Sequence, residues 1–373
     1  MVALRAVVTS VTLFGSMSLL GSCLCHGPSG TRTAALATSP SPAPPAVPAM
    51  DSAPTFVETH NVNFHLGGDV VMRIRHLQGV MRGRDGIVDF DDSRSFTTWV
   101  GSAEAALGAD DLTNLMNNHV FAYRGAPLRN IRVELKDGKL VQSGILHKGV
   151  DIPFKIVSDV SLTDDGRIRL HPVDTDIFCV DGDRLMKALG LTMQKMVDLS
   201  KAVGVTIEKN DFILDPVRVL PPPIIKGRLL SVRIVNDELV QEIGPLPGSE
   251  AQFASISRPT PTPPDTLVKN YMYYRGGRLH FGRKLLMQDA DMQVVDAEQS
   301  DPFDFDIDHY MVQLVAGSAH TLANAGLLVL MPDAHRVTRL ELSAGGEVVS
   351  SRDTACNCKA PPLDQVRARS KKP

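Results

Sequence analysis

Apolar and polar residues alternate along much of this chain, which is typical of strands with one buried face. Residues 139–170, KLVQSGILHKGVDIPFKIVSDVSLTDDGRIRL, predict three short strands joined by two tight turns. There Val150, Ile152, Phe154 and Ile156 alternate with polar residues and proline, which predicts a sheet with one apolar face. That face covers either a packed core or a lipid. The same alternation predicts strands over 62–66, 70–83 and 95–100.

Two segments have the spacing of amphipathic helices instead. The first lies near 109–120, where Asp110 or Asp111 can cap its N-terminus. The second lies near 181–203 and is rich in methionine, which packs in cores and also suits a groove for flexible chains. The apolar stripes are Leu112, Leu115 and Met116 in the first helix, and Leu185, Met186, Leu189, Met193, Met196, Val197 and Ala202 in the second.

The N-terminus has the pattern of an export signal, with Arg5 before an apolar run and small residues before a cysteine. Leu20-Gly21-Ser22-Cys23 matches a bacterial lipobox, so residues 1–23 are predicted to be a lipoprotein signal with Cys23 as the acylated residue. An ordinary secretory signal is the alternative. Leu24 follows the cysteine, which resembles the outer-membrane sorting pattern and predicts the periplasmic face of the outer membrane of a bacterial cell envelope.

The rest of the chain divides by composition into an α+β body and low-structure segments. Strand and helix patterns fill most of 55–350, whereas proline, serine and alanine dominate two shorter stretches. The predicted units are a disordered tether at 24–54, a β/α domain at 55–245, a proline-rich linker at 246–265, a β-rich region with one helix at 266–350, and a disordered basic tail at 351–373.

Charge and motifs exclude several functions. The 373 residues carry a formal net charge of −3 and no long basic run before the tail, which argues against a nucleic-acid partner. The five cysteines form no evident disulfide framework. The chain has no G-x-S-x-G, H-E-x-x-H or P-loop motif, so no enzyme and no cofactor are predicted.

Two acidic stretches, VDFDD at 88–92 and DFDID at 304–308, could bind a hard cation through carboxylate oxygens. A metal-dependent hydrolase built on these aspartates is the weakest of the functional hypotheses. We favour an exposed strand face for the second stretch, with Asp308 as the N-cap of a following helix, and make the same interpretation for Asp89, Asp91 and Asp92. No metal site is therefore predicted.

The order of elements after Asp111 resembles bacterial members of the TULIP (tubular lipid-binding) superfamily, especially YceB-like lipoproteins and LmeA-like periplasmic proteins. DGKLVQSGILHKGVDIPFKI, DDGRIRL and DRLMKALGLTMQKMVDL carry the resemblance, which covers residues 110–245. It implies a highly curved antiparallel sheet wrapped around the long helix, with an apolar groove for acyl chains.

The sequence thus predicts an exported, lipid-anchored protein that binds or shuttles a lipid or other apolar small molecule. The predicted lining is Phe154, Ile156, Leu185, Leu189, Met193 and Met196, and the membrane is reached through acylated Cys23. The alternative is a non-enzymatic envelope scaffold or interaction module with a filled core, whose protein partners the sequence does not identify.

Overall fold

The computed structural model describes residues 53–67, 69–177, 180–181, 194, 197–249, 253, 269–283, 285–322, 326–337, 340–342 and 348–351. This part of the chain is mostly β-structure, with 57% strand and 12% helix. Most strands belong to one large sheet, ordered β13 (Arg228–Val235), β14 (Glu238–Gly244), β4 (Phe96–Gly108), β2 (Val70–Gly83), β1 (Thr55–Leu66), β15 (Tyr271–Arg275), β18 (Asp291–Asp296), β21 (Leu327–Met331) and β20 (Ser318–Thr321). Two further strands join it, β12 (Ile224–Lys226) beside β4 and β19 (Phe303–Asp306) beside β1.

A second sheet, which we call the curled sheet, contains the three strands predicted over 139–170. Its order is β10 (Val205–Glu208), β11 (Asp211–Leu214), β8 (Ile168–Ile177), β7 (Asp151–Leu162), β6 (Lys139–His147) and β5 (Leu128–Lys136), with β9 (Val180–Asp181) beside β8. Two small sheets are β17 (Leu285–Gln288), β16 (Arg278–Phe281) and β3 (Val88–Asp89), and β22 (Leu340–Leu342) with β23 (Val348–Ser351). The predicted three-strand meander is therefore confirmed.

Strand β1 joins the N-terminal and C-terminal parts of the large sheet. Its first half pairs antiparallel with β15, and its second half pairs parallel with β19. Asn61 lies at the change of partner with a φ of 54°, in the left-handed region that asparagine tolerates better than most residues. Its Nδ2 donates to Oδ1 of Asn270 at 2.5 Å. Strands from both sides of the linker predicted at 246–265 thus pair with each other in this sheet.

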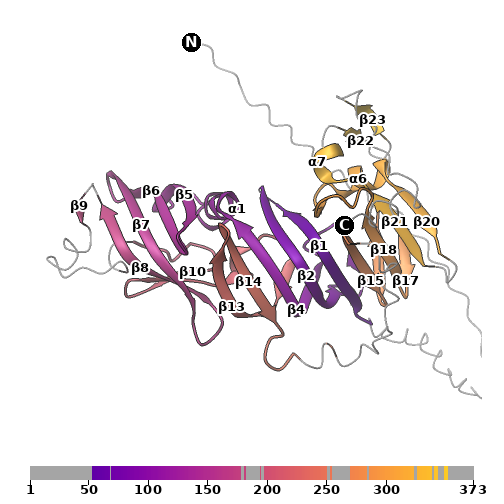
Figure 1. Ribbon diagram of the computed structural model, residues 1–373, viewed down its shortest axis with the longest axis horizontal. Coiled ribbons are helices and arrows are strands. Elements are labelled where there is room, and N and C mark those ends of the chain that lie inside the picture. The colour runs from indigo at the N-terminus through magenta and orange to yellow at the C-terminus, as the bar shows by residue number, and fades with distance from the viewer. Residues whose placement is uncertain are drawn as a thin grey trace, which may run out of the picture. The chain divides into compact units, whose positions relative to one another are not determined.

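Helix α1 (Ala109–Leu115) continues into a π-helix, η1 (Met116–Val120), and contacts both sheets (Figure 1). Side chains of this helical segment form hydrogen bonds with the backbone of β5 on the edge that no other described strand pairs with. Thr113 Oγ1 accepts from the N–H of Val133 at 3.0 Å, and Asn117 exchanges two bonds with the backbone of Ile131, at 2.7 and 3.0 Å. These bonds satisfy polar groups of β5 next to the core.

Asp111 makes the matching connection to the large sheet. Its carboxylate accepts from the backbone N–H of Val71 on β2 and of Gly108 at the helix start, both at 2.9 Å. It also pairs with Arg73 at 2.5 Å. The predicted first helix is therefore confirmed, and Asp111 acts at its third position, reaching back to the N-cap, Gly108.

Three more short helices lie among the described residues: α4 (Pro216–Val219), α6 (Tyr310–Ala316) and α7 (Ala334–Val337). Asp215 caps α4 by accepting from the N–H of Val217 at 3.1 Å. One apolar core extends under both sheets and includes α1, so buried residues such as Leu107, Leu112 and Leu128 belong to a single cluster.

The predicted fold class, an α+β fold with a curved sheet wrapped around a long amphipathic helix, is wrong for the described residues, which are mostly β and include no such helix. The sheet does curl, but the end of the predicted second helix forms turns. Asp198 Oδ1 accepts from the N–H of Ser200 at 2.9 Å, which is an Asx turn, and Gly204 follows with a φ of 68°. These local bonds compete with helix formation. Residues 182–193 and 195–196 of that segment lie outside the described residues.

We predict that Asp111→Ala lowers the free energy of unfolding by about 2–4 kcal/mol, because two backbone N–H groups and a guanidinium lose their acceptor at a buried position. Urea denaturation of the purified protein measures this change. Asp110→Ala, in the same helical turn but exposed, is the matched control and should cost less than about 0.5 kcal/mol. Equal effects of the two changes would contradict the role given to Asp111.

Candidate functional site

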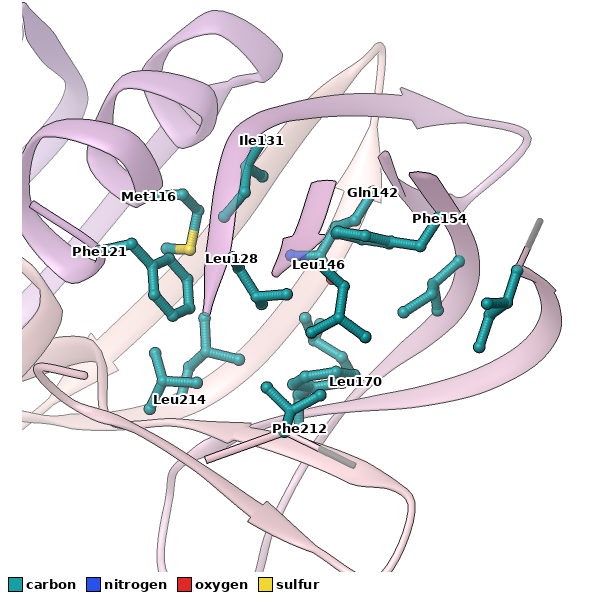
Figure 2. A pocket seen from close by; sticks show the side chains of 14 residues that line it. Met116, Phe121, Leu128, Ile131, Gln142, Leu146, Phe154, Leu170, Phe212 and Leu214 are labelled. Carbon is teal, nitrogen blue, oxygen red and sulfur yellow. The ribbon is translucent and has the colours of Figure 1, made fainter. Parts of the chain in front are cut away.

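An apolar cavity lies inside the curled sheet (Figure 2). Side chains from β5, β6, β7, β8, β10, β11 and η1 surround it, and Gln142 supplies the one polar side chain among its described lining residues. The lining is Met116, Phe121, Leu128, Ile131, Gln142, Leu146, Phe154, Ile156, Leu170, Ile177, Val197, Val205, Phe212 and Leu214. Strand alternation explains pairs such as Gln142 with Leu146 and Phe154 with Ile156, because every second residue of a half-buried strand faces the same side.

The cavity is narrow. Its total empty volume, including the part open to solvent, is about 670 Å³. The volume that the centre of a water-sized molecule can occupy is only about 40 Å³. A cavity that holds one water needs roughly 10–15 Å³ by this second measure. The cavity therefore has room for a few molecules the size of water. A longer ligand would have to displace side chains. Met116 is suited to this, because methionine is unbranched and adapts its shape.

Val197 also lines an open hollow of about 560 Å³ beside the cavity. This hollow is more polar, and the backbone N–H of Ser200 holds the pKa of Asp198 below its ordinary value. Its other described walls are Pro127, His147, Lys148, Gln194, Leu199, Ser200, Thr206 and Ile207. An apolar cavity thus adjoins a polar hollow of mixed charge.

Two of the predicted ligand-binding residues line the cavity. Ile156 is buried at 4% exposure, and Phe154 is half-buried. Val150, at the start of the same apolar alternation, is 61% exposed in the turn before β7. The remaining predicted ligand-binding residues, Leu185, Leu189, Met193 and Met196, and the predicted lipidation site, Cys23, lie outside the described residues.

A second apolar cavity, of about 50 Å³ by the same measure, lies under the large sheet. Its described lining includes Val57, Phe64, Met72, Ile74, Phe96, Pro223, Met272 and Tyr274. Burial raises the pKa of the Tyr274 phenol, so this residue stays neutral. Its hydroxyl lies 3.3 Å from the Met272 sulfur. Sequence patterns did not distinguish this cavity from the ordinary core.

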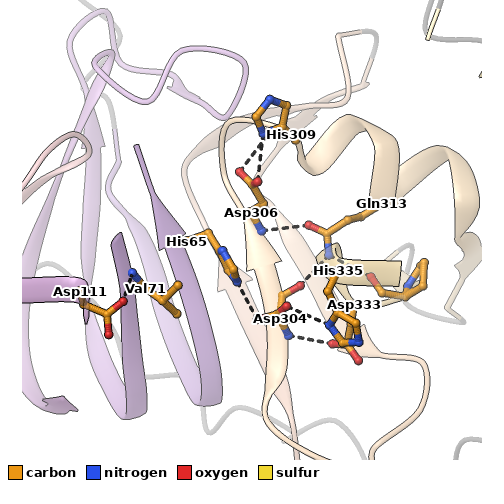
Figure 3. A network of polar contacts seen from close by, with 10 residues as sticks. His65, Val71, Asp111, Asp304, Asp306, His309, Gln313, Asp333 and His335 are labelled. Atoms are coloured by element: carbon orange, nitrogen blue, oxygen red, sulfur yellow. Dashed lines mark hydrogen bonds and ion pairs between the residues drawn. The ribbon is translucent and has the colours of Figure 1, made fainter. Parts of the chain in front are cut away.

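A polar network lies where β1, β19 and the two helices α6 and α7 meet (Figure 3). Asp304 is its centre, since its carboxylate binds His65 Nε2 at 2.6 Å and His335 Nδ1 at 3.0 Å. Burial raises the pKa of Asp304, but the two histidines outweigh it and hold the pKa below its usual range. Burial lowers the pKa of His65, and the bond to Asp304 more than reverses this.

The network extends to carboxyl groups with little access to solvent. Asp333, 1% exposed, accepts from the Asp304 backbone N–H at 2.8 Å through Oδ1, while Oδ2 is buried with no hydrogen-bond partner among the described residues. Burial and the nearby Asp296 raise the pKa of Asp333 to about 7, and burial raises the pKa of Asp296 to about 6. Neither group lines a described cavity, so we assign the network to structure.

The expected N-cap at Asp308 is wrong, because His309 is the N-cap of α6 and no side chain caps the helix; Asp306 instead closes the turn before it. Asp306 Oδ1 accepts from the backbone N–H groups of Asp308 and His309 at 3.0 and 3.1 Å, just before α6 begins at Tyr310. Gln313 then bonds to strand backbone at Asp306. Sequence patterns missed His65 because its partner Asp304 lies 239 residues away, and missed Gln313 because its side chain bonds to backbone groups.

Comparison of the chain with protein-family models, with curated proteins and with solved structures found no match. The resemblance to TULIP proteins therefore stays a prediction. No helix in the described part of the chain is long and apolar enough to cross a membrane.

We predict that Asp333→Asn stabilises the protein at pH 8. Because the folded-state pKa of about 7 lies above the ordinary 3.8, the folded chain binds the Asp333 proton more tightly than the unfolded chain. The resulting stability is complete below about pH 4 and is lost as the pH rises through 7. Asparagine keeps the acceptor for Asp304 without the charge, so we expect a gain of roughly 1–3 kcal/mol at pH 8 and little at pH 4.

Thermal unfolding of both proteins across pH 4–8 measures this difference. Asp308→Asn, at an exposed carboxylate in the same region, is the control and should leave the pH profile unchanged. His65 loses stabilising charge above its own pKa in both proteins, so only the difference between them is interpreted. Parallel profiles for wild type and Asp333→Asn would show that Asp333 is ionised without cost.

Proposed function

We propose that the protein binds a lipid or another long apolar ligand, with an apolar chain inside the curled sheet. The observation that carries the proposal is the lining of the cavity, in which thirteen of the fourteen described residues are apolar. Ligand sites are typically concave and mostly apolar, with a few polar groups that orient the ligand. Gln142 and the adjoining polar hollow provide such groups.

The magnitudes support a single chain rather than a bulky ligand. Burying one methylene group contributes about 0.8 kcal/mol, so eight groups would contribute roughly 6 kcal/mol before the cost of ordering the chain. That is enough for micromolar to millimolar binding. The free space of 40 Å³ is too small for eight groups, so binding requires side chains such as Met116 and Phe154 to move.

The same narrow space favours the second candidate, a non-enzymatic scaffold of the envelope with a filled core. A packed interior needs no ligand, and protein interiors contain few voids larger than a water molecule. Both candidates share the proposed location, a bacterial cell envelope reached through the export signal and acylated Cys23.

The first test is lipid extraction and mass spectrometry of the protein purified without detergent. We expect a co-purifying lipid in stoichiometric amount, and binding of the fluorescent fatty acid cis-parinaric acid after extraction. Leu146→Trp fills the cavity and should weaken this binding at least tenfold. The control is Ile145→Trp, on the neighbouring residue of β6, whose side chain faces the other side of the strand.

Thermal melts of both tryptophan variants show whether each remains folded. A wild-type protein that carries no lipid and binds no parinaric acid would contradict the proposal and leave the scaffold as the better hypothesis. Equal binding by Leu146→Trp and Ile145→Trp would place any bound fatty acid outside this cavity.

The membrane tether has a separate test. We predict that Cys23→Ser moves the protein from the membrane fraction to the soluble fraction of bacterial cells and removes the mass of the acyl groups. Cys25→Ser, two residues later, is the matched control and should stay with the membrane. Membrane association that survives Cys23→Ser would contradict the lipobox.

A further inference from the structure

Three metal-ligating side chains meet on the small sheet that contains β3 and β16, away from the apolar cavity of the curled sheet. They are Asp89 at the end of β3, Asp91 two residues later, and His280 on β16. One ligand atom from each lies within 4.8 Å of the others. The two strands are parallel neighbours with His280 opposite Asp89, so backbone pairing places the imidazole beside the carboxylate.

The distances fit a small divalent cation. The Nδ1 atom of His280 lies 2.9 Å from Oδ1 of Asp89 and 3.7 Å from Oδ2 of Asp91. Zinc binds imidazole nitrogen and carboxylate oxygen at about 2.0–2.2 Å, which in tetrahedral geometry separates neighbouring ligand atoms by roughly 3.3 Å. The two observed separations lie on either side of this value, so shifts of about half an ångström would bring them to it.

Hydrogen bonds already orient the two carboxylates. Asp91 accepts from the hydroxyl of Tyr310 at 2.5 Å through Oδ1 and from the backbone N–H of Arg283 at 2.9 Å through Oδ2. The backbone N–H of Asp91 donates to Oδ1 of Asp89 at 2.9 Å. Metal-binding carboxylates typically have such supporting donors, which fix the direction of the ligand atom.

Aromatic rings pack on the apolar side of the same strands. Phe90 lies between the two aspartates in sequence, and Phe281 follows His280; both are buried. Their rings pack edge to face at 5.4 Å, and each also contacts the ring of Tyr310. Alternation along β16 turns His280 to the side opposite Phe281, and Asp89 and Asp91 flank the buried Phe90, so the aromatic core supports the three ligands before an ion binds.

One side of the group is open. Asp89 and His280 line a hollow of about 450 Å³ together with Arg84, Asp85, Ile87, Asp92, Ser95 and Leu286. Arg84 donates to the backbone carbonyl of Arg94 at 3.0 Å. The hollow gives a route for an ion and room for a water molecule as a further ligand.

We infer that Asp89, Asp91 and His280 form a Zn²⁺ site with three protein ligands and one position open to solvent. Two oxygen ligands and one imidazole nitrogen are a donor set that zinc accepts, whereas an all-oxygen set would favour Mg²⁺ or Ca²⁺. The ion takes the place of a proton on Nδ1, which passes to solvent. The site is independent of the proposed lipid binding.

The test is titration of the full chain, stripped with a chelator, with Zn²⁺ alone against a chromogenic zinc indicator. We expect one zinc ion per chain at this site and a rise in the unfolding temperature with zinc concentration. His280→Ala should weaken the site at least a hundredfold. Asp91→Asn, which is nearly isosteric and keeps one oxygen that can accept from Tyr310, should weaken it at least tenfold.

His309→Ala is the matched control, because His309 also pairs with an aspartate, Asp306, but has no third ligand group in the described structure. It should bind zinc as the wild type does. Circular dichroism establishes whether each variant is folded. If His280→Ala does not fold, the test rests on Asp91→Asn. No zinc binding by the wild type, or binding unchanged in folded His280→Ala or Asp91→Asn, would overturn the inference.

Discussion

The hydrogen bonds from α1 and η1 to strand backbone are the constraint on which the two larger sheets depend. A strand edge next to a core leaves backbone N–H and C=O groups that must find partners. Here side chains supply these partners. Asp111 forms a hydrogen bond with the backbone of β2, and Thr113 and Asn117 form hydrogen bonds with the backbone of β5. One short helical segment therefore ends the pairing of one sheet and supports the edge of the other, and the apolar core continues beneath both.

The same helical segment borders the apolar cavity. Met116 belongs to η1, directly after the helix, and its side chain forms one wall of the apolar cavity. Thr113 and Asn117, which bond to the sheet backbone, are therefore close in sequence to Met116, the side chain best able to adapt its conformation. Displacing Met116 leaves the hydrogen bonds of Thr113 and Asn117 intact, because its thioether takes no part in them. A narrow resting cavity is thus compatible with binding of a flexible chain.

Local patterns predicted local structure well. Alternation in 139–170 predicted β6, β7 and β8, and the apolar spacing after Asp110 predicted α1. The second helix failed in its last turns because periodicity counts apolar side chains but not the competing bonds of a residue such as Asp198. Phe154 and Ile156 were placed in the lining from alternation alone, whereas Phe212 and Phe121 come from distant segments that alternation cannot bring together.

Long-range polar partners were beyond such patterns for the same reason. The aspartates of VDFDD were interpreted as an exposed strand face, but strand pairing brings His280 beside Asp89, 191 residues later in the chain. The DFDID stretch looks similar in sequence, yet its aspartates are each occupied by different partners: Asp304 by two histidines and Asp306 by the start of α6. Two similar acidic patterns thus differ in chemistry. In the first, one ligand atom from each of Asp89, Asp91 and His280 lies within 4.8 Å of the others, and in the second Asp304 and Asp306 bind different partners.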